Sequence, residues 1–555
     1  MSIENISAQS RPFGLRLNLA ALLFLAPFLF LISAETTLAQ GFKMTQLNAP
    51  GNAKGTFPSG LNTAQSVVGS YTNNSGAVVG FSYIGGKYAN VVFPGSDNFS
   101  RANGINDSGT IVGDFFGSDG GYHGFTLING NYTQFDVDKG VVSTSIFAIN
   151  NAGDFVGTAG DNGFIDVGGG ITQFSANSGA TITYNYNVNS SDESAGQWFD
   201  TSGNSHGFYR DASGNITEMD YPGAAQTGSI GINNSGEITG YYVDTSGNTH
   251  GFGYSAGTYT TNDFPFTNGI NNKGAYVGYY VGPDGVVFGY IASPQTFKLS
   301  QVKIPQAKQG VFDGVNNAGV YVGSYVDSSG KSHGMMISGK KVTNVDDPKG
   351  TTTCLGINSK NDIVGFYLDS AGNPHGFQYA SGKFKDVLGP TGALSSEASG
   401  INDAGEISGY FEDSATNDHG FILKSGKYTQ LDAPGSIATF AWGINKSSTV
   451  SLQWFDANGY LESATYKGKK YTTINVPGAL FTGVHSINTA GDLVFSWDDP
   501  VGNSHGALKK GPSYFVFDYP KGSNTGAEGI NDSGLLVGHY TPSGKSVPQP
   551  YKGTE

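Results

Sequence analysis

The histidines are the residues whose spacing first suggests chemistry. Seven of the nine stand directly before a glycine: His123, His206, His250, His333, His375, His419 and His505. Imidazole is the commonest metal ligand in proteins, so a ring of these residues would be a metal site. In six of the seven, however, an Asp lies six residues earlier, as Asp244 lies before His250. Because this pair recurs, we expect each histidine to bond to its own turn, and we predict no metal and no other cofactor.

A serine-hydrolase pattern, Gly-x-Ser-x-Gly, occurs around Ser205, Ser332 and Ser504. That pattern works where a strand turns sharply into a helix and exposes the serine. Here it falls in a predicted hairpin turn. Related turns carry other residues in place of the serine, namely Thr249, Pro374 and Asp418. We therefore interpret the match as a by-product of repetition and predict no catalytic residue from it.

Two further residue types suggest ligands. Trp198, Trp454 and Trp497 have faces on which a sugar could stack, but they occupy a position that is aromatic in eleven of twelve similar segments. We therefore predict that they pack between repeats. Asp-x-Ser-Gly-Asn turns such as 244–248 offer oxygens for calcium, yet they lack the dense carboxylates of a calcium loop. We expect turns bonded to themselves, and we assign no catalytic, binding or metal residue.

These residues all belong to one repeat, which is anchored on an asparagine that follows Leu, Ile or Val. The twelve anchors are Asn62, Asn106, Asn150, Asn189, Asn233, Asn271, Asn316, Asn358, Asn402, Asn445, Asn488 and Asn531. Their spacing runs from 38 to 45 residues, and the eleven intervals average about 43, the period of a four-stranded propeller blade. A glycine stands seven residues after ten of the twelve anchors.

One repeat indicates how the unit folds. A short strand ends at Asn233, a turn follows, and β-rich runs cover 237–243, 250–255 and 259–264. Gly reaches 84 residues and charged residues only 13%, whereas aromatic residues make up 13%, a mixture typical of turn-rich β structure. Four short strands cannot bury both of their faces alone. We therefore predict an all-β chain of stacked propeller blades.

A longer period indicates two rings. The segment 42–47 resembles 297–302, and 197–200 resembles 453–456, each about six repeats later. We predict two six-bladed propellers over residues 40–293 and 294–555, with a seam near Ser293-Pro294. One twelve-bladed ring would exceed the usual four to eight blades, and an open solenoid would leave half-blades exposed. Because 42–47 matches a fourth strand and 546–553 a third, we expect a strand from the other end of the chain to close a ring.

The N-terminus has the order of a secretory signal peptide. Arg11 and Arg16 precede an apolar run over 19–32, and Thr37-Leu38-Ala39 follows, so we predict cleavage after Ala39, with 1–39 as the signal. An uncleaved anchor is the alternative, but this 14-residue run is shorter than the ~20 residues that span a bilayer. We expect a secreted, extracellular or periplasmic protein without stable membrane insertion.

The charge and the cysteine content narrow the partners. A net charge of −14 argues against nucleic acid, whose binding normally needs a basic face. Cys354 is the single cysteine, so no internal disulfide can form and a large apolar core must stabilise the chain.

Four motifs together resemble a known family. Gly-Ile-Asn-(Asn/Asp)-x-Gly, Val-Gly-x-Tyr, Asp-x-x-Gly-x-x-His-Gly-Phe and Asp-x-Pro-Gly recur from residue 42 to 553. They are similar to the bacterial extracellular repeats called the HAF family. The copy at 161–164 lacks the His, and 458–463 lacks His-Gly-Phe. The resemblance implies secretion and a propeller-like array, and it implies no reaction and no catalytic residue.

The leading functional hypothesis is a secreted, non-catalytic scaffold that binds a glycan, a peptide or an extracellular protein on one rim, where irregular loops gather. The rival is a propeller enzyme that acts on polysaccharide as a hydrolase or lyase. A structural adhesin is a third possibility. Several Asp, Glu, His or Arg side chains outside the repeat pattern that converge in one central funnel would favour the enzyme.

Overall fold

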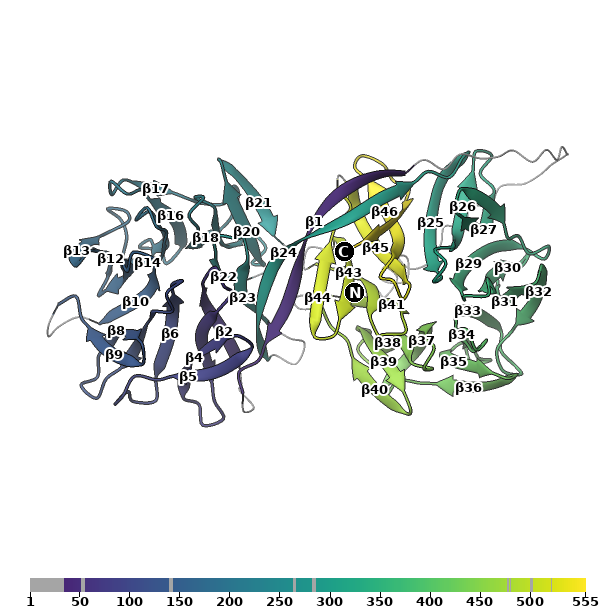
Figure 1. Cartoon of the computed structure of the whole chain (residues 1–555), viewed down its shortest axis with the longest axis horizontal. Coiled ribbons are helices and arrows are strands. Elements are labelled where there is room, and N and C mark those ends of the chain that lie inside the picture. The colour runs from purple at the N-terminus through teal and green to yellow at the C-terminus, as the bar shows by residue number, and fades with distance from the viewer. Residues whose placement is uncertain are drawn as a thin grey trace.

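The computed structural model describes residues 34–555 except 51–54, 139–142, 263–265, 282–285, 477–478, 480, 500–502 and 521. The described residues form strands and turns without a helix, and the strands build four-stranded antiparallel sheets arranged around two centres (Figure 1). The prediction of tandem all-β propellers is confirmed. Residues 1–33 of the predicted signal peptide lie outside the described part of the chain.

The N-terminal ring has six blades. Its first three are β2 (Gly55–Leu61), β3 (Val67–Thr72), β4 (Val78–Ile84) and β5 (Lys87–Val91); β6 (Ser100–Ile105), β7 (Ile111–Phe116), β8 (Tyr122–Ile128) and β9 (Asn131–Phe135); β10 (Thr144–Ile149), β11 (Phe155–Ala159), β12 (Asn162–Val167) and β13 (Gly170–Phe174). The next two are β14 (Ile182–Val188), β15 (Ser194–Phe199), β16 (Ser205–Arg210) and β17 (Ile216–Glu218); β18 (Gln226–Ile232), β19 (Ile238–Val243), β20 (Thr249–Ser255) and β21 (Thr258–Asn262). The sixth contains β22 (Phe266–Ile270), β23 (Tyr276–Val281) and parts of β24 (Val287–Val302) and β1 (Ala34–Leu47).

The C-terminal ring also has six blades. Its first three are β25 (Ala307–Val315), β26 (Tyr321–Asp327), β27 (Ser332–Ser338) and β28 (Lys341–Asn344); β29 (Thr351–Ile357), β30 (Ile363–Leu368), β31 (Pro374–Ala380) and β32 (Lys383–Val387); β33 (Ser395–Ile401), β34 (Ile407–Glu412), β35 (Asp418–Lys424) and β36 (Lys427–Leu431). The next two are β37 (Ser436–Ile444), β38 (Val450–Asp456), β39 (Leu461–Lys467) and β40 (Lys470–Thr473); β41 (Phe481–Ile487), β42 (Leu493–Asp498), β43 (Ser504–Lys510) and β44 (Ser513–Phe517). The sixth contains β45 (Gly522–Ile530), β46 (Leu536–Pro542), β47 (Gln549–Thr554) and part of β24.

Glycines in the turns between strands allow the chain to reverse within each blade. Between β18 and β19, Gly236 has φ of +75°, and between β19 and β20, Gly247 has φ of +90°. Positive φ is readily adopted by glycine, so these positions reverse the chain tightly. The apolar faces are buried between neighbouring blades, as Phe252 packs with Ile232 of its own blade and Ala195 of the preceding one. Each blade therefore depends on its neighbour for a core.

Each ring is closed by a strand from a distant part of the chain. In the first ring, β1 supplies the last strand, because Phe42 pairs with Pro294 and Leu47 with Gly289 of β24. In the second ring, the later half of β24 plays this part, because Leu299 pairs with Gly553 of β47. The long strand β24 thus runs unbroken through the predicted seam and serves both rings.

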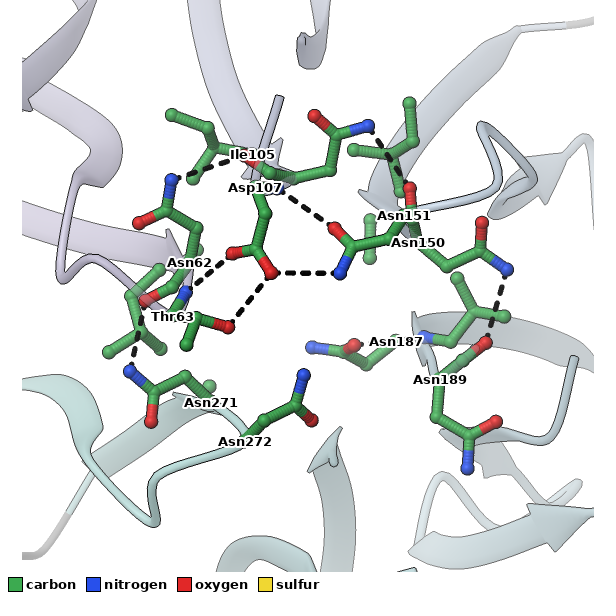
Figure 2. Close-up of a pocket in the computed structure, with 18 of the residues that line it drawn as sticks. Asn62, Thr63, Ile105, Asp107, Asn150, Asn151, Asn187, Asn189, Asn271 and Asn272 are labelled. Carbon is green, nitrogen blue, oxygen red and sulfur yellow. Dashed lines mark hydrogen bonds between the residues drawn. The ribbon is translucent and has the colours of Figure 1, made fainter. Parts of the chain in front are cut away.

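The anchor asparagines form a closed circle of hydrogen bonds in each ring. Each Nδ2 donates to the backbone oxygen of the anchor in the next blade, and Asn271 returns to Asn62 at 2.9 Å (Figure 2). In the second ring, Asn531 returns to Asn316, also at 2.9 Å. Two circles of six anchors exclude one twelve-bladed ring and an open solenoid.

The same asparagine also fixes its own turn. The Oδ1 atom of Asn106 accepts a hydrogen bond from the backbone N–H of Thr110 at 3.0 Å, while its Nδ2 donates to Asn150. Asparagine offers both an acceptor and a donor on one short side chain. This double use explains why the anchor is Asn in every repeat.

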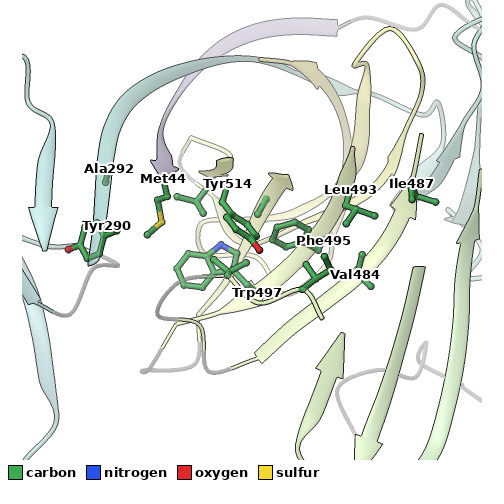
Figure 3. Close-up of a cluster of buried hydrophobic side chains, with 13 residues drawn as sticks. Met44, Tyr290, Ala292, Val484, Ile487, Leu493, Phe495, Trp497 and Tyr514 are labelled. Atoms are coloured by element: carbon green, nitrogen blue, oxygen red, sulfur yellow. The ribbon is translucent and has the colours of Figure 1, made fainter. Parts of the chain in front are cut away.

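The two rings lie side by side and share a sheet (Figure 1). The strand β1 pairs with β24 on one edge and with β44 of the second ring on the other, for example through Met44 and Tyr514. Met44 and Tyr290 pack in one buried cluster with Trp497 and Tyr514 (Figure 3). The contact between the rings is therefore both hydrogen-bonded and apolar.

Candidate functional site in the C-terminal ring

The recurring histidines bond to their own turns, as the sequence predicts. His250 Nε2 lies 3.1 Å from Asp244 Oδ2. A second carboxylate, which the sequence analysis missed, binds the other ring nitrogen in five copies, as Asp346 Oδ2 lies 2.8 Å from His333 Nδ1. Each such histidine also lies against the aromatic residue nine positions after the anchor, with 4.3 Å between the ring centroids of Trp198 and His206. These histidines join turns and strands within a blade.

The other recurring residues have structural roles as well. Ser205 is the first residue of β16, in a hairpin rather than before a helix, so the serine-hydrolase reading is wrong on geometry. Trp198, Trp454 and Trp497 are buried, which confirms their packing role. Asp244 Oδ1 accepts hydrogen bonds from two backbone N–H groups of its own turn. The turns are self-bonded, as expected.

One surface group could hold a metal ion. Ligand atoms of His206, Glu218 and Asp220 lie within 4.8 Å of one another. His206 Nδ1 is already 2.7 Å from Asp220 Oδ2, the same contact that the sister blades make. The group therefore repeats the pattern of the blades with one added carboxylate.

A different position lines the channel of the C-terminal ring. Three residues before each anchor, the innermost strand has a β-bulge, where the register with the next strand shifts, as between Ala527 and Gly529. A bulge re-aims a side chain and is frequent beside active sites. The six residues at this position line one cavity of about 110 Å³: Asp313, Leu355, Ser399, Trp442, His485 and Glu528. That volume is enough for several water molecules.

The chemistry-bearing residues of the cavity come from adjacent blades. Closure of the ring makes the sixth blade, which holds Glu528, the neighbour of the first, which holds Asp313. His485 and Trp442 follow on the fifth and fourth blades. Four consecutive blades therefore present a carboxyl, a second carboxyl, an imidazole and an indole to one cavity.

Glu528 lies between two imidazoles. Its Oε2 is 3.1 Å from His485 Nδ1 and its Oε1 is 3.5 Å from Nδ1 of His539, which β46 of the same blade supplies. Gly526 makes this arrangement possible, because a Cβ there would lie 2.7 Å from Glu528 Oε1 and 2.8 Å from the His539 ring. The Glu528 side chain is only 12% exposed.

Burial shifts the proton affinities of all four groups. It holds the pKa of Asp313 well above its usual range, and the Glu528 carboxyl raises this pKa further. It also raises the pKa of Glu528, an effect that His539 opposes. Burial lowers the pKa of His485 to about 4 and lowers that of His539. Near neutral pH, both imidazoles are therefore neutral and Asp313 holds its proton more tightly than an exposed carboxyl does.

Several polar atoms at the cavity have no hydrogen-bond partner among the described residues. These atoms are Asp313 Oδ2, Ser399 Oγ and Trp442 Nε1. An unsatisfied buried polar group costs about 1–3 kcal/mol, so such groups mark places that a ligand or water completes. Trp442 also approaches His485 edge to face, with 5.7 Å between ring centroids. The cavity thus joins paired carboxyls with donors and an aromatic side chain.

The comparisons with known proteins report the fold. No family model and no curated protein matches the chain, so the resemblance to HAF repeats stays a prediction. A gluconolactonase from Xanthomonas campestris is similar over 46% of this chain and 89% of its own, at 10% identity and a TM-score of 0.33. TolB from Acinetobacter baumannii is similar over 48% of this chain and 76% of its own, at 8% identity and a TM-score of 0.34.

A third solved structure is the propeller domain of the Trilobed protease from Pyrococcus furiosus. It covers 60% of this chain and 95% of its own, at 8% identity and a TM-score of 0.24. Identities this low concern the fold alone. In the part of the chain that the structure describes, no helix is long and apolar enough to cross a membrane.

Proposed function

We propose that the C-terminal ring hydrolyses glycosidic bonds, with Asp313 as the general acid and Glu528 as the general base. The observation that carries this proposal is the convergence of these two carboxyls, together with His485, in one channel cavity. None of the three belongs to the recurring motifs of the repeat. The hydrolytic form of the rival hypothesis is therefore favoured over the non-catalytic scaffold.

The proposed reaction uses water and needs no further reactant. Asp313 transfers its carboxyl proton to the leaving oxygen as the bond from the anomeric carbon to that oxygen breaks, and the oxygen keeps the electron pair. Glu528 takes a proton from a water molecule, whose oxygen bonds to the anomeric carbon. Two hydroxyl groups result, and a proton then passes from Glu528 back to Asp313 through solvent. Paired carboxyls of this kind are the usual machinery for glycoside hydrolysis.

The remaining cavity residues support these two carboxyls. The neutral imidazoles of His485 and His539 lie 3.1 and 3.5 Å from the Glu528 carboxylate without adding a full positive charge, so the carboxylate keeps its affinity for a proton. Trp442 offers an indole N–H and an apolar face beside the reacting groups. Indole rings bind the apolar faces of sugars, which suits a saccharide substrate.

A hydrolysis screen tests the proposal. Purified protein is incubated with aryl glycosides and with polysaccharides, and released phenol and reducing ends are measured. We expect Glu528→Gln and Asp313→Asn each to lower the rate by about 10²- to 10⁴-fold. The matched control is Glu218→Gln, an exposed carboxylate of the first ring.

Folding of each variant is checked by its near-ultraviolet circular dichroism. Equal rates in folded wild type, Glu528→Gln and Asp313→Asn would overturn the assignment. Release of products with an unsaturated sugar at the non-reducing end would show elimination by a lyase and would also contradict the assignment.

A further inference from the structure

The N-terminal ring has a group of seven aromatic side chains on its inner strands, four of them at the repeat positions that hold Asp313, His485, Glu528 and His539 in the C-terminal ring. These residues lie five or three positions before an anchor, or eight after it, on the two innermost strands of their blades: Phe57, Phe147, Tyr184, Tyr186, Tyr241, Phe266 and Tyr279. All seven are half-buried, unlike Trp198 and Trp497 at the neighbouring position, which are buried. We call these seven residues the aromatic arc.

The arc consists of stacked groups on consecutive blades. Tyr184 and Tyr186 are stacked, with centroids 5.7 Å apart and planes inclined by 12°. Phe147 of the preceding blade lies 5.1 Å from Tyr186. Such ring geometry is stable and holds the side chains in place.

A second group lies where the ring closes. Phe266 and Tyr279 are stacked at 4.6 Å and 6°, and Phe57 of the first blade meets Tyr279 edge-on at 5.4 Å. Between the two groups, the fifth blade contributes Tyr241, whose hydroxyl accepts a hydrogen bond from Gln197 Nε2 at 2.9 Å. The arc therefore runs across five of the six blades with its rings fixed in orientation.

The remaining blade contributes a polar group. Asp114, with a side chain fully shielded from solvent, accepts hydrogen bonds from Arg101 Nε at 2.9 Å, Asn103 Nδ2 at 3.1 Å and Ser145 Oγ at 2.8 Å. The Arg101 side chain is 36% exposed. Asn103, which shares Asp114 with Arg101, also donates a hydrogen bond to the backbone oxygen of Ile146 at 2.9 Å, next to Phe147 of the arc. Arg101 thus keeps exposed donors while Asp114 balances its charge.

We propose that the aromatic arc and Arg101 bind a neutral saccharide. Aromatic faces stack on the apolar faces of sugar rings, and the tyrosine hydroxyls and Arg101 supply donors and acceptors for sugar hydroxyls. Because the charge of Arg101 is already balanced, the site gives no preference to an anionic ligand. This binding function is distinct from the hydrolysis proposed for the other ring and does not depend on it.

Calorimetric titration tests the inference. The full chain is first screened on an array of neutral oligosaccharides, acidic oligosaccharides and peptides, and the best neutral binder is then titrated. We expect Tyr241→Ala and Tyr184→Ala each to weaken its affinity by about tenfold, the effect of losing one stacking contact. Tyr460→Ala is the matched control, since Tyr460 is 62% exposed on the second ring.

One further variant and the control keep the outcome decisive. Arg101→Gln removes the charge but keeps a donor, so neutral-sugar affinity should fall by less than in the tyrosine variants. Tyr460→Ala should leave the affinity unchanged, because Tyr460 lies on the second ring and outside both proposed sites. Unaltered affinity in both folded tyrosine variants, or binding confined to peptides or acidic sugars, would overturn the inference.

Discussion

The two rings share one scaffold but differ at the position three residues before each anchor. In the first ring this position holds Ser59, Asn103, Phe147, Tyr186, Ile230 and Asn268. In the second it holds Asp313, Leu355, Ser399, Trp442, His485 and Glu528. The register shift of the bulge is present in both, as at Ala102 and Gly104 or at Ala527 and Gly529. The repeated strands and turns therefore determine the shape of each ring, and the bulged residue of each blade determines the chemistry of its channel.

Opening one ring at a time is the strongest way to break the comparison. A chain that begins at Asn48 lacks β1, whose Met44 and Leu47 are each 1% exposed. Leu47 packs in the core of the first ring and Met44 packs against Trp497 of the second. Each loss removes about 1.5–3 kcal/mol, so we expect the unfolding midpoint of the first ring, which also loses its closing strand, to fall by about 5 °C or more. Differential scanning calorimetry measures this fall in the unfolding midpoint.

The matching variant for the second ring is a chain that ends at Pro548 and so lacks β47. We expect this truncation to lower the unfolding midpoint of the second ring. Limited proteolysis assigns each transition to its ring. An unchanged melting profile after the N-terminal deletion would contradict closure by β1.

Lowering the pH should sharpen the comparison through His485. Its pKa is about 4 in the folded ring because it is buried, against about 6.5 when unfolded. The folded state therefore disfavours protonation, so the stability that His485 contributes is complete above about pH 6.5 and is lost as the pH falls toward 4. We expect the unfolding midpoint of the second ring to fall further between pH 7.5 and 4.5 in the wild type than in a His485→Gln variant.

The repeat histidines act with the opposite sign, which gives an internal control. The hydrogen bond that the His333 ring donates to the Asp346 carboxylate raises the pKa of His333. Its contribution is present below about pH 6.5 and is lost as the pH rises through the folded pKa. The stability lost by a His333→Gln variant should therefore shrink as the pH rises, which is the reverse of the trend for His485→Gln. Equal pH sensitivity of wild type and His485→Gln would count against a neutral buried imidazole.

The anchor circles predict the smallest effect, and it should be alike in both rings. Asn271→Ala and Asn531→Ala each remove the donor that returns to the first blade. We expect a loss of about 1–3 kcal/mol in the unfolding free energy of the ring concerned, because buried acceptors stay unpaired. Denaturant titration measures this loss. Asn→Asp at the same positions keeps the turn acceptor but not the donor, so a stable Asp variant would refute the role of the circle.

The sequence predicted the scaffold because the scaffold repeats. Asn233, Gly236, Asp244 and His250 have counterparts elsewhere at fixed spacing, and their turns, bonds and strands match the structure. The closing segment 42–47 was also recognisable, since it resembles 297–302. Repetition thus revealed the residues that form the turns, although it did not reveal the second carboxylate that binds the histidine in five copies.

The candidate site could not be predicted in the same way because it does not repeat. Glu528 and His485 occupy a position whose residues differ in most blades, and only ring closure brings Glu528 beside Asp313. His539 was harder still to recognise, because it stands eight residues after its anchor, at a strand position whose residue type also varies between repeats. The sequence nonetheless contains a signal, a variable position three residues before each anchor that directly precedes a Gly in nine of the twelve repeats.

The circle of anchor asparagines has a direction but no first member. Every donor points to the next blade, and the last points to the first. A whole repeat could therefore be inserted or removed without leaving any asparagine unpaired, provided that the ring still closes. A ring could therefore evolve by duplication of a unit of about 43 residues, because the circle of hydrogen bonds could close after each addition. A gene that doubles such a ring gains a second, independent set of six channel positions, free to acquire a chemistry that the first set never had.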